Sequence, residues 1–169
     1  QLYAPLANRL GLYSMKWELE DLGFKYLHPE EYRELIKGIE QKREERLKFI
    51  EKIMADIRVQ LKKQHIEAEV TGRAKHLYSI YRKMERDNKT LDQIYDLFAL
   101  RIIVNSVKDC YAALGVVHEM YSPMPGRFKD YIAVPKTNMY QSIHTTLLGE
   151  KGTPFEVQIR TWDMHRIAE

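Results

Sequence analysis

Two stretches near the end of the sequence alternate polar and apolar residues, as half-buried strands do. The polar side chains that would share a face are Ser142, His144 and Thr146 in the first stretch, and Glu156, Gln158 and Arg160 in the second. If the two strands are neighbours, their sheet has an apolar face on the core and a polar face that lines a cleft. The alternative is a sheet face that is merely solvated.

The loops before these strands carry residues that suit nucleotides. Arg127 and Lys129 flank an aromatic residue directly after a Pro/Gly loop, and junctions of this kind often hold binding residues. Lys136, Asn138 and Tyr140 follow, and these three types can neutralise a phosphate, hydrogen-bond a base edge and stack on a base. The alternative is a polar turn with a solvated lysine and a packed tyrosine.

A predicted helix over residues 74–86 has cations at its beginning and along one side. The polar members of this side are Arg73, Lys75, Ser79, Arg82, Lys83 and Arg86. Cations at a helix N-terminus oppose the helix dipole, so the placement favours an anion that uses both these side chains and free backbone N–H groups. An ordinary amphipathic helix with a basic exposed face explains the pattern equally well.

Phosphoryl-type transfer usually needs a divalent cation held by carboxylates. Asp96, at the beginning of one predicted strand, and Glu156, in another, are the candidate ligands, and Mg²⁺ typically takes one or two protein carboxylates. For each residue the alternative is a solvated surface acid. The sequence has neither a Walker-type phosphate loop nor a dinucleotide fingerprint, so side chains would have to hold the phosphates.

The composition limits the classes of protein to which the chain can belong. The chain has 169 residues, 44% hydrophobic residues and a net charge of +3, which suit one soluble domain and are too weakly basic to predict nucleic-acid binding. No run is long and apolar enough for a membrane span, and no signal peptide precedes the domain. The one cysteine, Cys110, excludes an internal disulfide, fits a reducing cytoplasm and is expected to be a buried apolar residue.

The order of the expected elements indicates an α/β or α+β fold around a sheet of about five strands. One helix of about 50 Å is predicted over residues 29–63, preceded by one or two short helices over 6–24 with stops at Gly11 and Gly23. Residues 1–63 are therefore expected to form a packing arm rather than a site. In residues 64–169, strands are predicted at 66–70, 97–104, 130–134, 142–148 and 154–161, with helices at 74–86, 107–121 and 162–169.

Several ordered segments resemble the synthetase domain of long RelA/SpoT-type alarmone enzymes. These are Thr71–Lys75, Tyr95–Leu97, Gly126–Tyr131, Pro135–Thr146 and Phe155–Thr161, while Tyr3–Gly11 resembles the connector between hydrolase and synthetase domains. The resemblance implies a nucleotidyltransferase-like mixed sheet flanked by helices. It also implies a fragment of a longer protein, as do the start at Gln1 and an end inside the last predicted helix.

The resemblance further implies the reaction of the stringent response, in which pyrophosphate moves from ATP to the ribose 3′-hydroxyl of GDP or GTP. The implied roles are ATP binding by Arg73, Lys75, Ser79 and Lys83; phosphate binding by Arg127 and Lys129; and guanine-nucleotide binding by Lys136, Asn138, Tyr140 and His144. Asp96 would bind Mg²⁺, or Mn²⁺ in its place, and Glu156 would share the metal or accept the proton of the 3′-hydroxyl. Tyr140 would stack on the base.

The Arg127–Asp130 loop resembles that of enzymes that both make and destroy the alarmone, so the parent is expected to be bifunctional. No His-Asp dipeptide occurs here, so the hydrolase site is not in this chain. Met139 stands where many relatives have glycine, and its side chain argues against a strict need for a positive φ at that position. The alternative functions are a non-catalytic nucleotide-binding regulatory module and an RNA-binding domain. The ribosome would be reached only through the parent, and the oligomeric state is left open.

Overall fold

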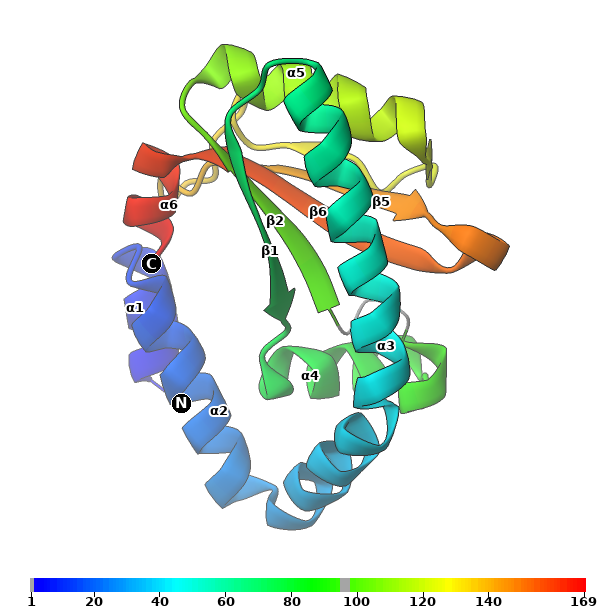
Figure 1. Cartoon of the computed structure of the whole chain (residues 1–169). Helices are drawn as coiled ribbons and strands as arrows, with labels where there is room; N and C mark the ends of the chain where they lie inside the picture. Colours follow the sequence, from blue (N-terminus) through cyan, green and yellow to red (C-terminus); the bar gives the residue numbers. More distant parts are fainter. Residues whose placement is uncertain (1, 95–97) are drawn as a thin grey trace.

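The computed structural model describes residues 2–94 and 98–169 (Figure 1). The helices are α1 (Tyr3–Arg9), α2 (Tyr13–Leu27), α3 (Pro29–Lys63), α4 (Leu77–Asp87), α5 (Val107–Met120) and α6 (Trp162–Ala168). The strands are β1 (Ala68–Ala74), β2 (Phe98–Val104), β3 (Ser122–Pro123), β4 (Lys129–Asp130), β5 (Ile143–Leu148) and β6 (Pro154–Thr161). Two short 3₁₀ turns, Leu91–Gln93 and Glu150–Gly152, precede β2 and β6.

The three N-terminal helices follow local signals in the sequence. The long helix α3 has the predicted bounds, with Pro29 in its first turn and two glutamates at its positive end. Gly11, at φ +73°, separates α1 from α2 because glycine adopts a left-handed conformation without steric cost. The predicted stop at Gly23 is wrong, since α2 continues through it to Leu27.

The sheet is mixed, as predicted, and has six strands rather than about five. The order is β1-β2-β6-β5-β3, with β4 also paired to β5. β2 and β6 run parallel, and the other pairs are antiparallel. The strand expected over residues 130–134 is only the two-residue β4, because the Asp130 carboxylate accepts hydrogen bonds from the N–H groups of Ile132 and Ala133, 3.0 and 2.9 Å, and closes a turn.

The first strand begins two residues later than expected and continues through Arg73. Its length is set by β2, with which it pairs over the whole stretch from Ala68 opposite Val104 to Ala74 opposite Phe98. This extension places Arg73 near the end of a strand rather than in a loop. The end of β1 and the beginning of α4 therefore lie close together, with only Lys75 and His76 between them.

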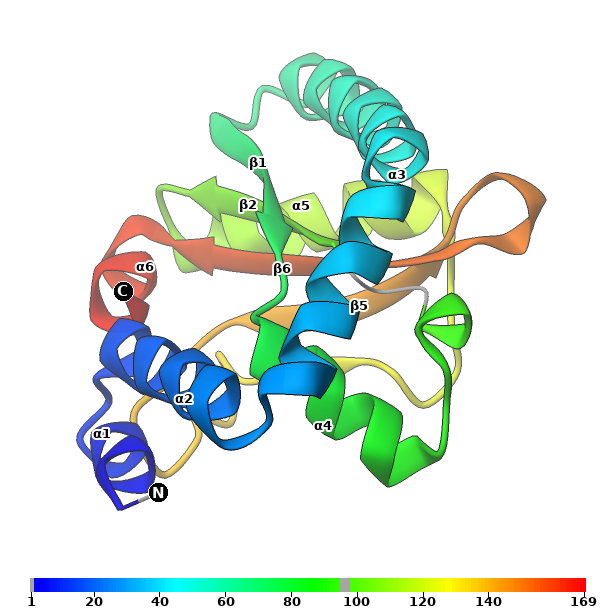
Figure 2. The same cartoon turned by 90° about the horizontal axis from the view of Figure 1, so that it is seen from below.

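One face of the sheet carries the main core. Helix α3 contributes Ile50, Ile53, Ile57 and Leu61, and α5 contributes Cys110, Ala113 and Val117. Figure 2 shows α5 and the C-terminal half of α3 on this face, and α2 and α4 on the opposite one. Cys110 is fully buried, and burial raises its pKa to about 12, which confirms the predicted apolar role. Within the described part of the chain, no helix is long and apolar enough to cross a membrane.

Candidate functional site

The polar rows of β5 and β6 are neighbours, as predicted. His144 lies opposite Gln158, and Thr146 lies opposite Glu156, so these side chains leave the sheet on one face. The face is not simply solvated, because Arg160 is fully buried and Gln158 is 6% exposed. The polar face therefore belongs to the interior of a site, in agreement with the first of the two interpretations.

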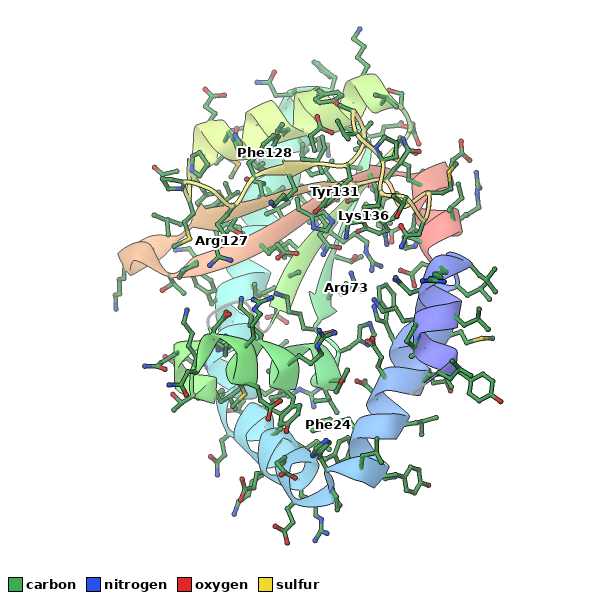
Figure 3. All side chains as sticks on the ribbon, turned by 180° about the vertical axis from the view of Figure 1, so that it is seen from behind. Phe24, Arg73, Arg127, Phe128, Tyr131 and Lys136 are labelled. Carbon is green, nitrogen blue, oxygen red and sulfur yellow. The ribbon has the colours of Figure 1, made fainter. Side chains whose placement is uncertain are left out.

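A pocket of about 250 Å³ opens on this face. Eight of the predicted binding residues line it: Arg73, Lys75, Ser79 and Lys83 from β1 and α4, and Lys136, Asn138, Tyr140 and His144 from the loop before β5 and from β5 itself. Arg73, Tyr131 and Lys136 are labelled on this side of the sheet in Figure 3. The structure thus brings the predicted ATP-side and guanine-side groups to the walls of one pocket.

Glu156 lies on this face beside the pocket: it is not among the described residues that line the pocket, but its neighbours Lys75, His144 and Gln158 are. One of its oxygens, Oε1, accepts a 2.8 Å hydrogen bond from Gln158 Nε2 and lies 4.0 Å from His144 Nδ1. The other, Oε2, lies 3.7 Å from Lys75 Nζ. Asp96, its predicted partner, lies outside the described residues; in β2, whose described part begins at Phe98, Ala99 is the register partner of Glu156. The pairing of the two acids stays a prediction.

Tyr140 and His144 form a buried polar pair. The hydroxyl of Tyr140 lies 2.8 Å from His144 Nε2, and the tyrosine is 6% exposed. Burial lowers the pKa of His144 to about 4, so the imidazole is neutral at pH 7. A neutral imidazole has one acceptor and one donor nitrogen, so either tautomer allows a hydrogen bond between His144 Nε2 and the Tyr140 hydroxyl.

Lys136 lies over two tyrosine rings. Its Nζ is 4.6 Å from the centroid of Tyr131 and 5.2 Å from that of Tyr140. Burial lowers the pKa of this ammonium group, and the nearby charge of Lys16 acts in the same direction. The ammonium group thus lies over the ring that was predicted to stack on the base, and the stacking role of Tyr140 stays a prediction.

Arg127 and Lys129 are exposed and are not among the described residues that line the pocket. Lys129 is the register partner of His144, so its side chain leaves the sheet on the same face, beside the pocket. Arg127 lies farther out, toward the end of β5 and β6, where Figure 3 labels it. The phosphate-binding role of both residues stays a prediction.

The pocket also contains residues that the sequence interpretation missed. Asn8, Lys16 and Trp17 come from α1 and α2, so the expectation that these helices stand apart from the site is wrong. The amide of Asn138 points at Asn8, with its Nδ2 3.4 Å from both the carbonyl oxygen and Oδ1 of that residue. A tryptophan on a short helix is typical of core packing, so no local signal marked it.

At the N-terminus of α4 one N–H group is already bound, since Tyr78 N–H donates a 2.9 Å hydrogen bond to Asp21 Oδ1, and anion binding there stays a prediction. Met139 has φ +67°, so this position adopts the left-handed conformation although its side chain argued against a strict need for it. The Met139 side chain is 72% exposed, so its Cβ is strained by its own backbone and not by neighbours.

Comparisons with known proteins identify the family of the chain. A family model described as "Region found in RelA / SpoT proteins" matches residues 72–169. A GTP pyrophosphokinase of Streptomyces coelicolor is 50% identical over 169 residues, which are 100% of this chain and 20% of the relative. A probable guanosine-3′,5′-bis(diphosphate) 3′-pyrophosphohydrolase of Synechocystis is 53% identical over 169 residues, 99% of this chain and 22% of the relative. The chain thus spans about a fifth of these relatives.

Among solved structures, the chain is similar to small alarmone synthetase 1 from Bacillus subtilis bound to its product pppGpp. The TM-score is 0.62 at 27% sequence identity, and the match covers 77% of this chain and 75% of that one. The likeness confirms the predicted mixed sheet flanked by helices.

Proposed function

Because the chain belongs to the RelA/SpoT family, we propose that it transfers pyrophosphate from ATP to the ribose 3′-hydroxyl of GDP or GTP, which releases AMP and forms (p)ppGpp. The observation that carries the proposal is the single pocket whose walls hold cations from β1 and α4 on one side and the Lys136–His144 group on the other. Two nucleotides have to meet in one place for this reaction, and alignment of the reactants supplies much of the acceleration.

On the ATP side, four groups from adjoining elements would hold the triphosphate. Arg73 lies near the end of β1, Lys75 follows that strand, and Ser79 and Lys83 lie one turn apart on α4. Three of the four are cations, and cations that face a transferring phosphoryl group stabilise the charge that develops on its oxygens. The serine hydroxyl adds a hydrogen bond without adding charge.

On the guanine side, Lys136, Asn138, Tyr140 and His144 would hold GDP or GTP. The amide of Asn138 offers both a donor and an acceptor, which suits a base edge. Because His144 is neutral at pH 7, it would act on the nucleotide as a hydrogen-bonding group and not as a cation. Lys136 supplies the positive charge for the phosphates.

Glu156 would act on the 3′-hydroxyl or on a metal ion. The described residues contain no cluster of three metal-ligating side chains, but Mg²⁺ commonly takes only one or two protein carboxylates and completes its shell with phosphate and water oxygens. Glu156, a described carboxylate beside Lys75 and His144, fits such a site, with Mn²⁺ as the alternative ion and Asp96 as the second ligand. When bound, the ion would neutralise negative charge on the phosphates. As a base, Glu156 would accept the proton of the 3′-hydroxyl.

The setting of the reaction is also part of the proposal. We expect the synthetase motifs to lie in residues 64–169, with residues 1–63 as a connector whose helix α3 also packs on the sheet. We further expect the domain to work in the cytoplasm and to belong to a bifunctional parent that meets the ribosome. The Arg127–Asp130 loop supports the bifunctional parent through its basic character.

The direct test is to incubate the purified chain with ATP, GDP and Mg²⁺ and to separate the nucleotides by anion-exchange chromatography. Guanosine tetraphosphate and AMP should appear in equal amounts. A folded sample, checked by circular dichroism, that forms neither product would refute the proposed activity. Nucleotide binding without turnover would instead favour the non-catalytic regulatory module, and steeply salt-dependent RNA binding would favour the RNA-binding domain.

A further inference from the structure

Helix α2 presents two side chains, Trp17 and Asp21, to the junction between β1 and α4. They lie four residues apart and so share one face of the helix. Figures 1 and 2 show α2 running past the beginning of α4 on the polar side of the sheet. The junction carries Arg73, Lys75 and the first turn of α4, which are the groups assigned above to ATP.

Trp17 holds the guanidinium group of Arg73. The indole ring is stacked on His76, with centroids 4.5 Å apart and an interplanar angle of 20°, and the Cζ of Arg73 lies 4.4 Å from the indole centroid. On its other side, Arg73 Nη1 donates a 3.0 Å hydrogen bond to Gln158 Oε1. The guanidinium is therefore fixed between a helix and the central strand β6.

The surroundings of Arg73 strengthen its contact with the indole ring of Trp17. Burial lowers the pKa of Arg73, which means that the guanidinium has lost much of its water. A cation over an indole face gains more attraction when it is desolvated than when it is exposed. Without the indole, this buried group would have to find another neighbour or move toward solvent.

Asp21 contacts the beginning of α4. Its Oδ1 accepts the hydrogen bond from Tyr78 N–H, and its Oδ2 lies 3.9 Å from His76 Nδ1. A carboxylate at this end satisfies a backbone donor and complements the helix dipole. Because Ser79 and Lys83 follow on the same helix, the orientation of their side chains depends on this contact.

We propose that Trp17 and Asp21 are positioning residues that fix the ATP-side groups, so that the placement of α2 sets the affinity for ATP. This inference rests on the function proposed above. Trp17 also packs against the cluster of Tyr140 and Ala168, which makes Asp21 the more selective probe of the ATP side, since its contacts lie with His76 and α4.

The test compares the affinities of the chain for a non-hydrolysable ATP analogue and for GDP by isothermal titration calorimetry. Asp21→Ala and Trp17→Ala should each weaken the ATP analogue about tenfold, and Asp21→Ala should change the GDP affinity by less than about threefold. Asp21→Asn and Trp17→Phe keep an acceptor and an aromatic face, so they should recover most of the loss. Met15→Ala, at a position of α2 that is 52% exposed, is the matched control and should bind both nucleotides normally.

A second measurement needs no disruptive variant. The chain has two tryptophans, so Trp162→Phe leaves Trp17 as the only indole emitter. Titration of this variant with the ATP analogue should change the emission of Trp17. If Trp17→Ala does not fold, the emission of Trp17 and the ATP affinity of Trp17→Phe test the positioning role instead.

The outcomes separate the two proposals. If the native chain binds the ATP analogue but the Asp21 and Trp17 variants bind it equally well, with no change in Trp17 emission, the positioning role is refuted and the proposed function stands. If the native chain binds no ATP analogue, the proposed function and the positioning role are both refuted.

Discussion

The buried pair of Tyr140 and His144 predicts a specific loss of stability in mild acid. Burial lowers the pKa of His144 from the ordinary value of 6.5 to about 4, although the nearby carboxylate of Glu156 acts in the opposite direction. The unfolded chain therefore takes up a proton on this residue at a higher pH than the folded chain does. Stability is unaffected above pH 6.5 and falls as the pH drops from there toward 4.

The size of the effect follows from proton linkage. A histidine with a pKa of 6.5 when unfolded and about 4 when folded disfavours the folded state at pH 5 by roughly 2 kcal/mol relative to pH 7. The side chain of His144 is 21% exposed, so solvent screening reduces this figure only modestly. About 2 kcal/mol is a substantial part of the stability of an ordinary domain.

The assay is urea unfolding followed by circular dichroism at pH 7 and pH 5, on the native chain and on His144→Gln. Other histidines, such as His76, His118 and His165, also have lowered pKa values, so the difference between the two proteins is the informative quantity. Glutamine does not titrate and keeps a hydrogen-bonding group near the Tyr140 hydroxyl. The native chain should lose roughly 2 kcal/mol more than His144→Gln on acidification. Equal losses in the two proteins would refute the reasoning.

Three further predictions concern the pocket. Glu156→Gln should lower the rate of alarmone formation about 100-fold or more while nucleotide binding persists, because the amide cannot accept the proton; unchanged rates would remove Glu156 from the mechanism. Tyr140→Ala should weaken binding of GDP about tenfold or more and binding of ATP less, as measured by calorimetry, and equal losses would contradict stacking on the base. Met139→Gly should raise the free energy of unfolding by about 0.5–1 kcal/mol, because glycine adopts φ +67° without the penalty of a side chain; a fall in the urea midpoint would contradict the strain.

The features predicted correctly were those encoded over short stretches of sequence. The bounds of α3 follow from Pro29, the two glutamates and a helical stripe, and the polar rows of β5 and β6 follow from alternation within each strand. The loop that leads into β5 then supplied three residues of the pocket lining, Lys136, Asn138 and Tyr140. The family resemblance supplied the roles of these residues, which spacing alone does not define.

The errors arose where tertiary contacts overrode local patterns. Trp17 and Asp21 lie on a helix far from the sheet in sequence, so nothing near them indicated that they contact Arg73 and Tyr78. The expected strand after Asp130 was lost to the hydrogen bonds of one carboxylate. At Met139 the backbone adopts a left-handed conformation, although the side chain argued against a strict need for it.

Because α3 and the sheet share one core, they have to be inherited or exchanged together. The family match begins at residue 72, yet four buried side chains of α3 form one wall of the core beneath that region. Burial of four such side chains contributes on the order of 8 kcal/mol, comparable with the entire stability of a typical domain. A chimaera that joins a foreign partner at residue 64 would therefore begin with an open hydrophobic core. Recombination that preserves folding must carry α3 along with the sheet, although the pattern that marks the family lies almost wholly outside that helix.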